Sequence, residues 1–416
     1  MKLLIKSATI LDRQSDFHKK TVDILIENGI IKKIGPNIQT NANQSISFKD
    51  LHVSRGWFDS SVSFGEPGFE ERETIANGLD TAAKSGFTSV ALNPDTSPVL
   101  DNNGAITSVL SKAGKHPVSL LPVGALTVKS KGVDLAELYD MQQAGAISFG
   151  DYKKSVGNPN LLKLALQYAQ NFDALVQSFP QENRIAGNGM VNEHHQSTML
   201  GLKGIPDLAE ELQITRDLYL LEYTGGKLHI PTISTEKSVK LIKEAKKKGL
   251  DVTCSVAIHN LTFTDELLNE FNTNAKLLPP LRTKKDVKAL IKGLKEGTID
   301  MVTSDHTPID TEHKKVEFDN ALFGSIGLES AFGALNTIFT PEESVEFLTL
   351  GKERFKIKNT GIAEGNPANL SLFEVKEEAV FGLDHIFSTS KNSIFLDYKI
   401  KGRALGVVTE KGSITV

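Results

Sequence analysis

Cysteine is almost absent from this sequence of 416 residues, which contains one, Cys254. A single cysteine excludes an internal disulfide and a cysteine-based zinc cluster, and it fits a reducing compartment. Long apolar runs are also missing, since no stretch approaches the roughly 18 apolar residues that a membrane span needs. The apolar stretch within Met1–Lys6 is too short for a signal peptide. We therefore expect a cytoplasmic protein that does not enter a membrane.

An excess of one charge is lacking as well. The chain has 47 Lys and Arg residues against 51 Asp and Glu residues, a formal net charge of -4, and no long block of either sign. This balance gives no electrostatic basis for binding nucleic acid or an anionic membrane, so we predict neither partner. What the chain does have is 39% hydrophobic residues, enough to bury a large core in one large domain and one smaller domain.

Between residues 54 and 366, apolar strand-like runs alternate with segments of helical period. This alternation is typical of a parallel sheet with crossover helices. With the stretch at Gly56 as the first strand, about eight such units predict a (β/α)8 TIM-like barrel, and a doubly wound open sheet is the alternative. The other predicted strands are Gly86–Leu92, Val118–Val123, Ala146–Phe149, Ala174–Gln177, His229–Ile233, Val252–Ile258 and Ile299–Thr303. Predicted helices include Pro206–Tyr223 and Glu236–Lys248.

Both ends of the chain are rich in β-forming residues instead. Residues 3–10 and 22–34 predict strands near the start, with a turn at Glu27-Asn28-Gly29. Near the other end, the predicted strands are Leu370–Phe373, Ser393–Tyr398 and Leu405–Thr409. We therefore predict a small discontinuous β-sandwich domain from residues 1–53 and 367–416, with the barrel at residues 54–366.

The functional groups of a (β/α)8 barrel follow its strands, at their carboxyl ends. The segment after the first predicted strand is DSSVSFGEPG (residues 59–68), and NPDTSP (residues 93–98) follows the second. These segments resemble two patterns of the dihydroorotase family in the amidohydrolase superfamily, Asp-x-His-Val-His-Leu-Arg-Glu-Pro-Gly and Met-Pro-Asn-Thr-x-Pro. The resemblance continues through GMVNE (residues 189–193), HIPTIST (229–235), PPLR (279–282) and SDHTPI (304–309). It implies the barrel fold of that superfamily.

The frame of the family's patterns is kept, but most of its functional residues are replaced. The resemblance implies that four metal-binding histidines correspond to Ser61, Ser63, Phe179 and Thr232. It also implies that substrate-contacting residues (an arginine, two asparagines and a histidine) correspond to Gly65, Asp95, Leu278 and Ile309. The last metal ligand, an aspartate, is present as Asp305.

The position that bridges two metals in the family leaves two interpretations open. Members that use a carboxylate there have Phe-Ser-Asp-Asp-Gly, and against this pattern Asp151 survives while Tyr152 does not. Related amidohydrolases with a carbamylated lysine would place that lysine near Gly150. Asp151 and Asp305 are therefore the surviving positions of ligand type.

Loss of these ligands predicts loss of the metal. A hydrolytic zinc site needs about three protein ligands and an open position to bring the pKa of a bound water near 7. Side chains of Ser, Phe and Thr do not replace imidazoles, so we expect neither zinc nor another cofactor. Asp305 is then a vestigial catalytic residue.

Three functional hypotheses follow from the resemblance. The first is a pseudoenzyme, because the chain resembles inactive dihydroorotase-like homologues that assemble with aspartate transcarbamoylase in pyrimidine biosynthesis; the family also implies a homodimer. The second is an active hydrolase of cyclic amides, with zinc in a rearranged site around Asp151, His229 and Asp305. The third is a small-molecule sensor that uses a remodelled pocket without chemistry.

Overall fold

The computed structural model describes the chain from residue 2 to residue 416, apart from the side chains of residues 269 and 270. Eight parallel strands form one sheet in the order β15-β14-β13-β10-β9-β8-β7-β6. An isolated parallel bridge between Val62 and His306 links its two edge segments, so the sheet is a nearly closed barrel. The strands are β6 (Trp57–Val62), β7 (Phe87–Leu92), β8 (Ser119–Gly124), β9 (Ser148–Phe149), β10 (Val176–Gln177), β13 (Leu228–Ile230), β14 (Val252–Ala257) and β15 (Met301–Thr303). The (β/α)8 prediction is confirmed, and the open-sheet alternative is wrong.

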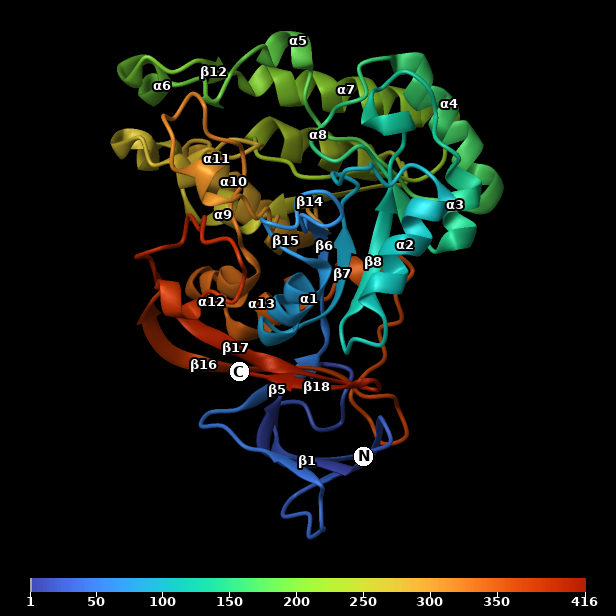
Figure 1. The fold of residues 1–416 in the computed structure, drawn as a ribbon, viewed down its shortest axis with the longest axis vertical. Helices are drawn as coiled ribbons and strands as arrows, with labels where there is room; N and C mark the ends of the chain where they lie inside the picture. Colours follow the sequence, from blue (N-terminus) through green and yellow to red (C-terminus); the bar gives the residue numbers. More distant parts are fainter. Residues whose placement is uncertain (1) are drawn as a thin grey trace.

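Helices surround the barrel strands (Figure 1). They are α1 (Ile75–Lys84), α2 (Asn103–Ala113), α3 (Leu138–Ala144), α4 (Pro159–Ala169), α7 (Asp207–Thr224), α8 (Glu236–Lys247), α10 (Lys284–Lys295) and α12 (Leu328–Ile338). Side-chain caps fix where several of them begin. The Thr235 side chain accepts the Ser238 N–H at the start of α8, and Thr283 forms a capping box with Asp286 at the start of α10. The two predicted helices at 206–223 and 236–248 are confirmed to within one residue at each end.

Shorter elements fill the connections. The helices are α5 (Asn183–Ala186), α6 (His195–Leu200), α9 (Ile258–Thr262), α11 (Thr311–Lys314), α13 (Pro341–Phe347) and α14 (Gly351–Arg354). Short 3-10 helices occupy Val128–Ser130, Gln170–Phe172, Asp265–Glu270, Thr273–Ala275 and Leu383–His385. Strands β11 (Val191–Asn192) and β12 (Gly204–Ile205) pair in the long insertion between β10 and α7. No helix within residues 2–416 is long and apolar enough to cross a lipid bilayer.

Strands from both ends of the chain form a second, separate sheet. Its order is β18-β17-β16-β5-β1-β2-β3, with β4 paired to β1. Both termini lie in this part of the molecule (Figure 1). The strands are β1 (Lys2–Ile10), β2 (Thr21–Glu27), β3 (Ile30–Gly35), β4 (Gln44–Ile46), β5 (His52–Arg55), β16 (Asn369–Val380), β17 (Lys399–Thr409) and β18 (Gly412–Thr415). A terminal β unit built from both ends is thus confirmed, and the boundaries at 53 and 367 stay a prediction.

One predicted strand is wrong. Residues 393–398 form a turn, in which the Tyr398 N–H donates to the Phe395 carbonyl. The apolar character that predicted a strand has another cause, because the Phe395 ring lies 5.0 Å from the ring of Phe263, outside the terminal sheet. The strand itself begins at Lys399.

The barrel interior is packed at its floor. Phe58, Val123, Leu175 and Met301, from four strand segments, form one buried cluster with Phe355, which follows α14. Close packing of this kind leaves the opposite end, where the strands terminate, as the place for polar groups.

Candidate functional site

The mouth of the barrel lies where the parallel strands end. Side chains from six of these strand ends converge there around a cavity of only about 10 Å³. A cavity of roughly 10–15 Å³ is the smallest that holds one water molecule. The lining residues are Ser61, Asn93, Tyr152, Lys153, Gln177, Phe179, Pro231, Thr232 and Asp305. The structure therefore brings Ser61, Phe179, Thr232 and Asp305 together, as neighbours in a mouth that side chains fill.

Asp305, the surviving ligand-type residue, is paired with a lysine. Lys153 Nζ lies 2.8 Å from Asp305 Oδ2, and the side chains are 12% and 3% exposed. Burial disfavours the charged form of Lys153, but the neighbouring Asp305 carboxylate outweighs this effect and holds the pKa of Lys153 above its ordinary value. The positive charge that a metal ion would supply to Asp305 thus comes from the chain itself.

Tyr152 fills the barrel mouth beside this ion pair. Its hydroxyl lies 3.3 Å from Asp305 Oδ1 and 2.9 Å from Thr307 Oγ1. Burial and the Asp305 charge raise the pKa of Tyr152, so the phenol stays protonated and donates. The backbone at Tyr152 is left-handed, with φ of 55°, which turns the chain just after β9 and lets Tyr152 and Lys153 both enter the mouth. Sequence reasoning missed the roles of these two residues.

Ser61 and Ser63, which the resemblance aligns with metal-binding histidines, belong to a hydrogen-bonded network. Asn93 Nδ2 donates to Ser61 Oγ at 3.1 Å and to Ser63 Oγ at 3.4 Å. Ser63 Oγ donates to Asp95 Oδ2 at 2.8 Å, and Ser61 Oγ lies 3.4 Å from Asp305 Oδ1. Burial raises the pKa of Asp95, although the bond from Ser63 opposes this effect. Asn93 therefore joins the two serines, Ser63 binds Asp95 and Ser61 reaches Asp305, while Asp95 Oδ1 is buried without a hydrogen-bond partner.

Asp59 holds two strand ends together. Its carboxylate accepts the N–H of Ser61 at 3.0 Å and the N–H of Ser304 at 2.9 Å, and it also accepts the Thr303 hydroxyl. Burial raises the pKa of Asp59 above its ordinary value, although these hydrogen bonds act in the opposite direction. The contacts position the segments that carry Ser61 and Asp305, a structural role for a buried carboxylate.

Apolar side chains occupy the insertion side of the mouth. Phe179 and Leu278 belong to one buried cluster that also contains Ala186, Ile205 and Ala209. These two residues replace, by the resemblance, a histidine and an asparagine. Their packing against the insertion removes space that a substrate would need.

Gly65 and Ile309, which the resemblance aligns with substrate-contacting residues, also offer no substrate-binding side chain. A Cβ atom at Gly65 would lie 1.8 Å from the Phe69 carbonyl oxygen, so this backbone has no room for an arginine. Ile309 is 4% exposed and its N–H donates to Asn392 Oδ1 at 3.0 Å. Neither position presents a group that could bind a carboxylate.

Asp151 points away from the mouth residues. Its carboxylate accepts the Thr127 N–H at 3.0 Å and the Thr127 hydroxyl at 2.5 Å. A side chain at the neighbouring Gly150 would meet Gln177 Cβ at 2.7 Å, so a bridging lysine does not fit there either. His229 Nδ1 lies 3.0 Å from Thr253 Oγ1.

The imidazole of His229 faces the barrel floor, where its ring lies 5.6 Å from the ring of Phe355. Burial lowers the pKa of His229 to about 3, so the ring is neutral. Asp151, His229 and Asp305 therefore have three separate sets of partners, and the structure does not assemble them into one centre.

Comparisons with known proteins agree with this framework. The family model described as Dihydro-orotase-like matches residues 53–238. A dihydroorotase from Ruminiclostridium cellulolyticum is 41% identical over 403 residues, which cover 95% of this chain and 94% of that protein. A dihydroorotase from Thermoanaerobacter sp. strain X514 is 39% identical over 409 residues, which cover 97% of this chain and 94% of that protein. The chain belongs to the dihydroorotase-like family.

Solved structures agree on the fold. The L-hydantoinase (dihydropyrimidinase) from Arthrobacter aurescens matches with a TM-score of 0.83 and 20% identity, covering 100% of this chain and 97% of that one. A D-hydantoinase from Thermus sp. gives a TM-score of 0.81 and 19% identity, covering 99% and 94% of the two chains. These likenesses show the amidohydrolase barrel with its terminal β domain.

The mouth residues of this dihydroorotase-like protein do not fit zinc. Zinc binds nitrogen, sulfur and carboxylate ligands, and here the ligand-type side chain Asp305 has an ammonium group 2.8 Å away. Within the part of the chain that the structure describes, no three His, Cys, Asp or Glu side chains lie close enough together to hold a metal ion. A cation placed beside Lys153 would also be repelled.

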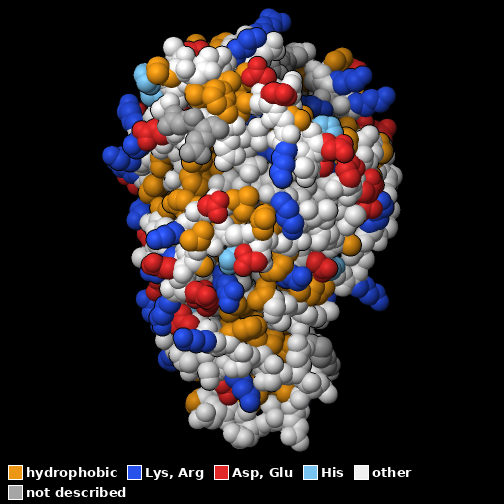
Figure 2. Space-filling view, turned by 60° about the vertical axis from the view of Figure 1, so that its left-hand side comes forward, with side chains coloured by type: hydrophobic (Ala, Val, Ile, Leu, Met, Phe, Trp, Pro, Cys, Tyr) orange, Lys and Arg blue, Asp and Glu red, His pale blue; other side chains and the backbone are white. Residues whose placement is uncertain are grey.

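One face of the protein surface is mixed in charge (Figure 2). Lys and Arg side chains are interspersed with Asp and Glu over the face shown in Figure 2, and on this face the described residues form no continuous patch of either sign. Electrostatic steering of a strongly charged polymer needs a field of one sign, which this face does not offer.

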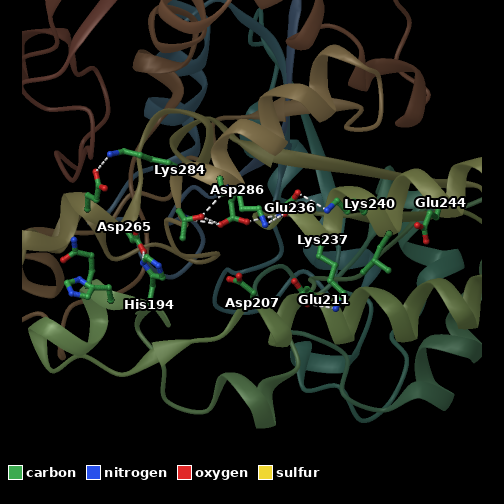
Figure 3. Close-up of a pocket in the computed structure, with 16 residues that line it drawn as sticks. His194, Asp207, Glu211, Glu236, Lys237, Lys240, Glu244, Asp265, Lys284 and Asp286 are labelled. Atoms are coloured by element: carbon green, nitrogen blue, oxygen red, sulfur yellow. Dashed lines mark hydrogen bonds and ion pairs between the residues drawn. The ribbon is translucent and has the colours of Figure 1, made fainter.

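A groove of about 1100 Å³ lies elsewhere, between α6, α7, α8 and α10. It is lined by charged side chains that face one another (Figure 3). Glu236 pairs with Lys240 at 2.9 Å and with Lys285 at 2.7 Å, and His194 lies 3.1 Å from Asp265. Because these charges neutralise one another and none of the mouth residues lines it, the groove is a solvated surface and not the catalytic centre of the fold.

Proposed function

We propose that this dihydroorotase-like protein does not hydrolyse cyclic amides and serves pyrimidine biosynthesis in the cytoplasm as a non-catalytic partner of aspartate transcarbamoylase. The observation that carries the proposal is the Lys153–Asp305 ion pair in a mouth with about 10 Å³ of free space. A hydrolase of this fold needs a metal-bound water and a place for its substrate at this position.

Chemistry at the mouth fails for two separate reasons. Asp305 alone could accept a proton, but it cannot polarise an amide carbonyl as a metal ion does. Its carboxylate is also engaged by Lys153, Tyr152 and Ser61. Substrate binding is blocked as well, since small-molecule pockets measure roughly 300–1,000 Å³. The small volume of the cavity also disfavours a small-molecule sensor that binds its ligand in this mouth.

The non-catalytic role is supported by what the chain has kept. The barrel, the terminal sheet and the loop-orienting Asp59 are intact, whereas the ligand positions are replaced by residues that fill and bind one another. A scaffold retained without its chemistry fits a protein that acts by assembly.

The assembly is tested by mixing the purified chain with aspartate transcarbamoylase from the same organism. Size-exclusion chromatography with light scattering should show a complex of defined stoichiometry that the transcarbamoylase alone does not form. The variant Lys153→Met tests whether the mouth takes part, and we expect it to assemble normally if folded. Two separate peaks at micromolar concentrations of both proteins would overturn the partnership.

An active cyclic-amide hydrolase with a rearranged metal site is the second candidate. The names of the relatives favour it, because proteins called dihydroorotase share 39% and 41% identity with this chain over nearly its whole length. This candidate requires bound zinc and a turnover of dihydroorotate that disappears in Asp305→Ala. Turnover that persisted in Asp305→Ala would point to a contaminating enzyme.

A further inference from the structure

A cavity of about 310 Å³ lies between the terminal β unit and the barrel. Its wall comes from residues 11–18 after β1, from Arg55 at the end of β5, and from residues 342–359, which include α13 and α14. Figure 1 shows α13 on the side of the barrel that faces the terminal sheet. Because β6 begins at Trp57, this end of the barrel is opposite the mouth. Small-molecule sites measure roughly 300–1,000 Å³ and often lie between structural units, so this cavity has the room for a ligand that the mouth lacks.

Arg55 lines this cavity with a guanidinium group that is only partly engaged. Its Nε lies 3.1 Å from Oδ1 of the buried Asp12. Nη1 and Nη2 form no hydrogen bond within the part of the chain that the structure describes. The Asp12 carboxylate is itself held by the N–H groups of Gln14 at 3.0 Å and Ile362 at 2.8 Å. A guanidinium binds a carboxylate through two parallel hydrogen bonds, so Arg55 can still bind the carboxylate of a ligand.

A second basic side chain acts on the charge of Arg55. Lys352 belongs to α14, between the lining residues Leu350 and Glu353, and is 1% exposed. Among the described residues, its Nζ has neither a hydrogen-bond acceptor nor an ion-pair partner. Burial and the Arg55 charge lower the pKa of Lys352 to about 7. An anionic group bound at Arg55 would offset this repulsion between two cations.

The cavity wall also carries hydrogen-bond acceptors. Asn359 Oδ1 is buried and has no hydrogen-bond partner among the described residues. The exposed Glu353 also lines the cavity, and its carboxylate forms no ion pair within that part of the chain. Buried polar atoms in folded proteins nearly always have a partner. Two acceptors without partners suit a ligand that donates hydrogen bonds, as an ammonium group does.

The balance of charge around the cavity restricts the ligand further. Two more acidic side chains of the wall, both in α13, already have basic partners. The pairs are Glu342–Lys19 at 2.8 Å and Glu346–Arg13 at 3.1 Å. A ligand with several negative charges, such as a nucleotide, would be repelled by Glu353 and these carboxylates, whereas a simple amine would be repelled by Arg55. The ligand that fits carries one charge of each sign.

We propose that this cavity binds a small zwitterion, an α-amino acid, with its carboxylate on Arg55 and its ammonium group toward Glu353 and Asn359. The buried side chains of Leu11 and Val345 line the same cavity and offer apolar contact to the rest of the ligand. Since Arg55 belongs to the terminal sheet and Glu353 to α14, a bound ligand joins the two units and stabilises their junction. The cavity is then a sensor site that is separate from the mouth.

The first test screens the twenty common L-amino acids, each at 10 mM, against the full chain by differential scanning fluorimetry. At ten times its dissociation constant, a ligand of this site should raise the unfolding temperature by about 1–3 °C. Isothermal titration calorimetry of the same amino acid should give saturable binding of one molecule per chain.

The carboxylate contact is tested by Arg55→Lys, which keeps a positive charge beside Asp12 but loses the planar fork of donors. We expect this variant to fold and to bind the amino acid about tenfold more weakly, because two charge-assisted hydrogen bonds become one. Arg403→Lys is the matched control, since Arg403 is half exposed and lies outside the cavity. Its dissociation constant should stay within about twofold of wild type. Circular dichroism and thermal unfolding show whether each variant keeps its fold.

The ammonium contact is tested by Glu353→Gln, which should weaken binding about fivefold through the loss of one charge. The N-acetylated form of the same amino acid carries no positive charge. It should bind the wild-type chain more weakly than the free amino acid, and Glu353→Gln should not weaken it further. Glu377→Gln, at an exposed glutamate outside the cavity, is the control.

Either of two results would overturn the proposal. One is the absence of saturable binding by any of the twenty amino acids; if inorganic phosphate then bound and Arg55→Lys abolished that binding, the cavity would be a simple anion site. The other is an amino acid whose dissociation constant is unchanged in both Arg55→Lys and Glu353→Gln when the variants are folded. Neither measurement involves metal, turnover or aspartate transcarbamoylase, so the outcome is independent of the proposed function.

Discussion

Lys153 Nζ lies 2.8 Å from Asp305 Oδ2 at the carboxyl ends of the barrel strands, with both side chains largely buried. This pair occupies the place where hydrolases of the fold carry out their chemistry. A lysine in contact with the surviving aspartate neutralises its charge, fills space and opposes the entry of a metal ion. We propose that this pair stands in place of a reaction centre.

Removing the lysine should destabilise the protein. Lys153→Met leaves the Asp305 carboxylate buried without its counter-charge, and breaking a buried pair costs about 3–5 kcal/mol of the free energy of unfolding. The double variant Lys153→Met with Asp305→Asn should recover most of that loss, because no unpaired charge remains. Urea denaturation measures both values, and the exposed neighbour Lys154→Met is the control, expected within about 0.5 kcal/mol of wild type. A loss below about 1 kcal/mol for Lys153→Met would show that the pair is not important for the fold.

The apolar filling of the mouth should behave as core. Leu278 is 9% exposed and packs with Phe179, so Leu278→Ala should lower the free energy of unfolding by about 2–4 kcal/mol. Leu383→Ala makes the same chemical change at a residue that is 61% exposed, and it should cost no more than about 0.5 kcal/mol. Chemical denaturation of the two variants side by side gives the comparison. Equal losses would mean that Leu278 borders an open pocket rather than a packed one.

Acid should destabilise the protein partly through His229. Burial lowers the pKa of this imidazole to about 3, below the ordinary value near 6.5. The unfolded chain therefore binds a proton below pH 6.5 that the folded chain refuses, and stability is lost as the pH falls from 6.5 toward 3. Between pH 6.5 and 4.5 this amounts to about 2–3 kcal/mol.

The variant His229→Gln isolates the contribution, because it keeps a hydrogen-bonding group near Thr253 but cannot titrate. We expect its free energy of unfolding to fall less steeply than that of wild type over the same pH range. Parallel curves for the two proteins would show that His229 is accessible to protons in the folded state.

The fold could be predicted from the sequence because its signals are repetitive. Alternation of apolar runs with helical segments placed all eight barrel strands, and the strand-end motifs carried the family. The turn at 393–398 was wrongly predicted as a strand. Phe395 is buried against Phe263 on the barrel side, and a buried apolar residue in a turn gives the same sequence signal as one in a strand.

The candidate site was harder to predict, because a motif gives positions but not side-chain directions. Ser61, Thr232 and Asp305 meet at the mouth, whereas Asp151, adjacent to the residues that plug it, faces Thr127. The side chains of Tyr152 and Lys153 enter the mouth because the backbone at Tyr152 is left-handed. No residue pattern in the sequence predicts this conformation. A lysine beside a former ligand position was the available signal.

The central claim is tested most directly by the metal content of the chain. Elemental analysis of protein purified without chelator, paired with assays of dihydroorotate hydrolysis and cyclisation on the same sample, should find far less than one zinc per chain and no turnover above a boiled control. About one or two zinc ions per chain, together with turnover that disappears in Asp305→Ala, would contradict the account and restore an active hydrolase at this barrel mouth.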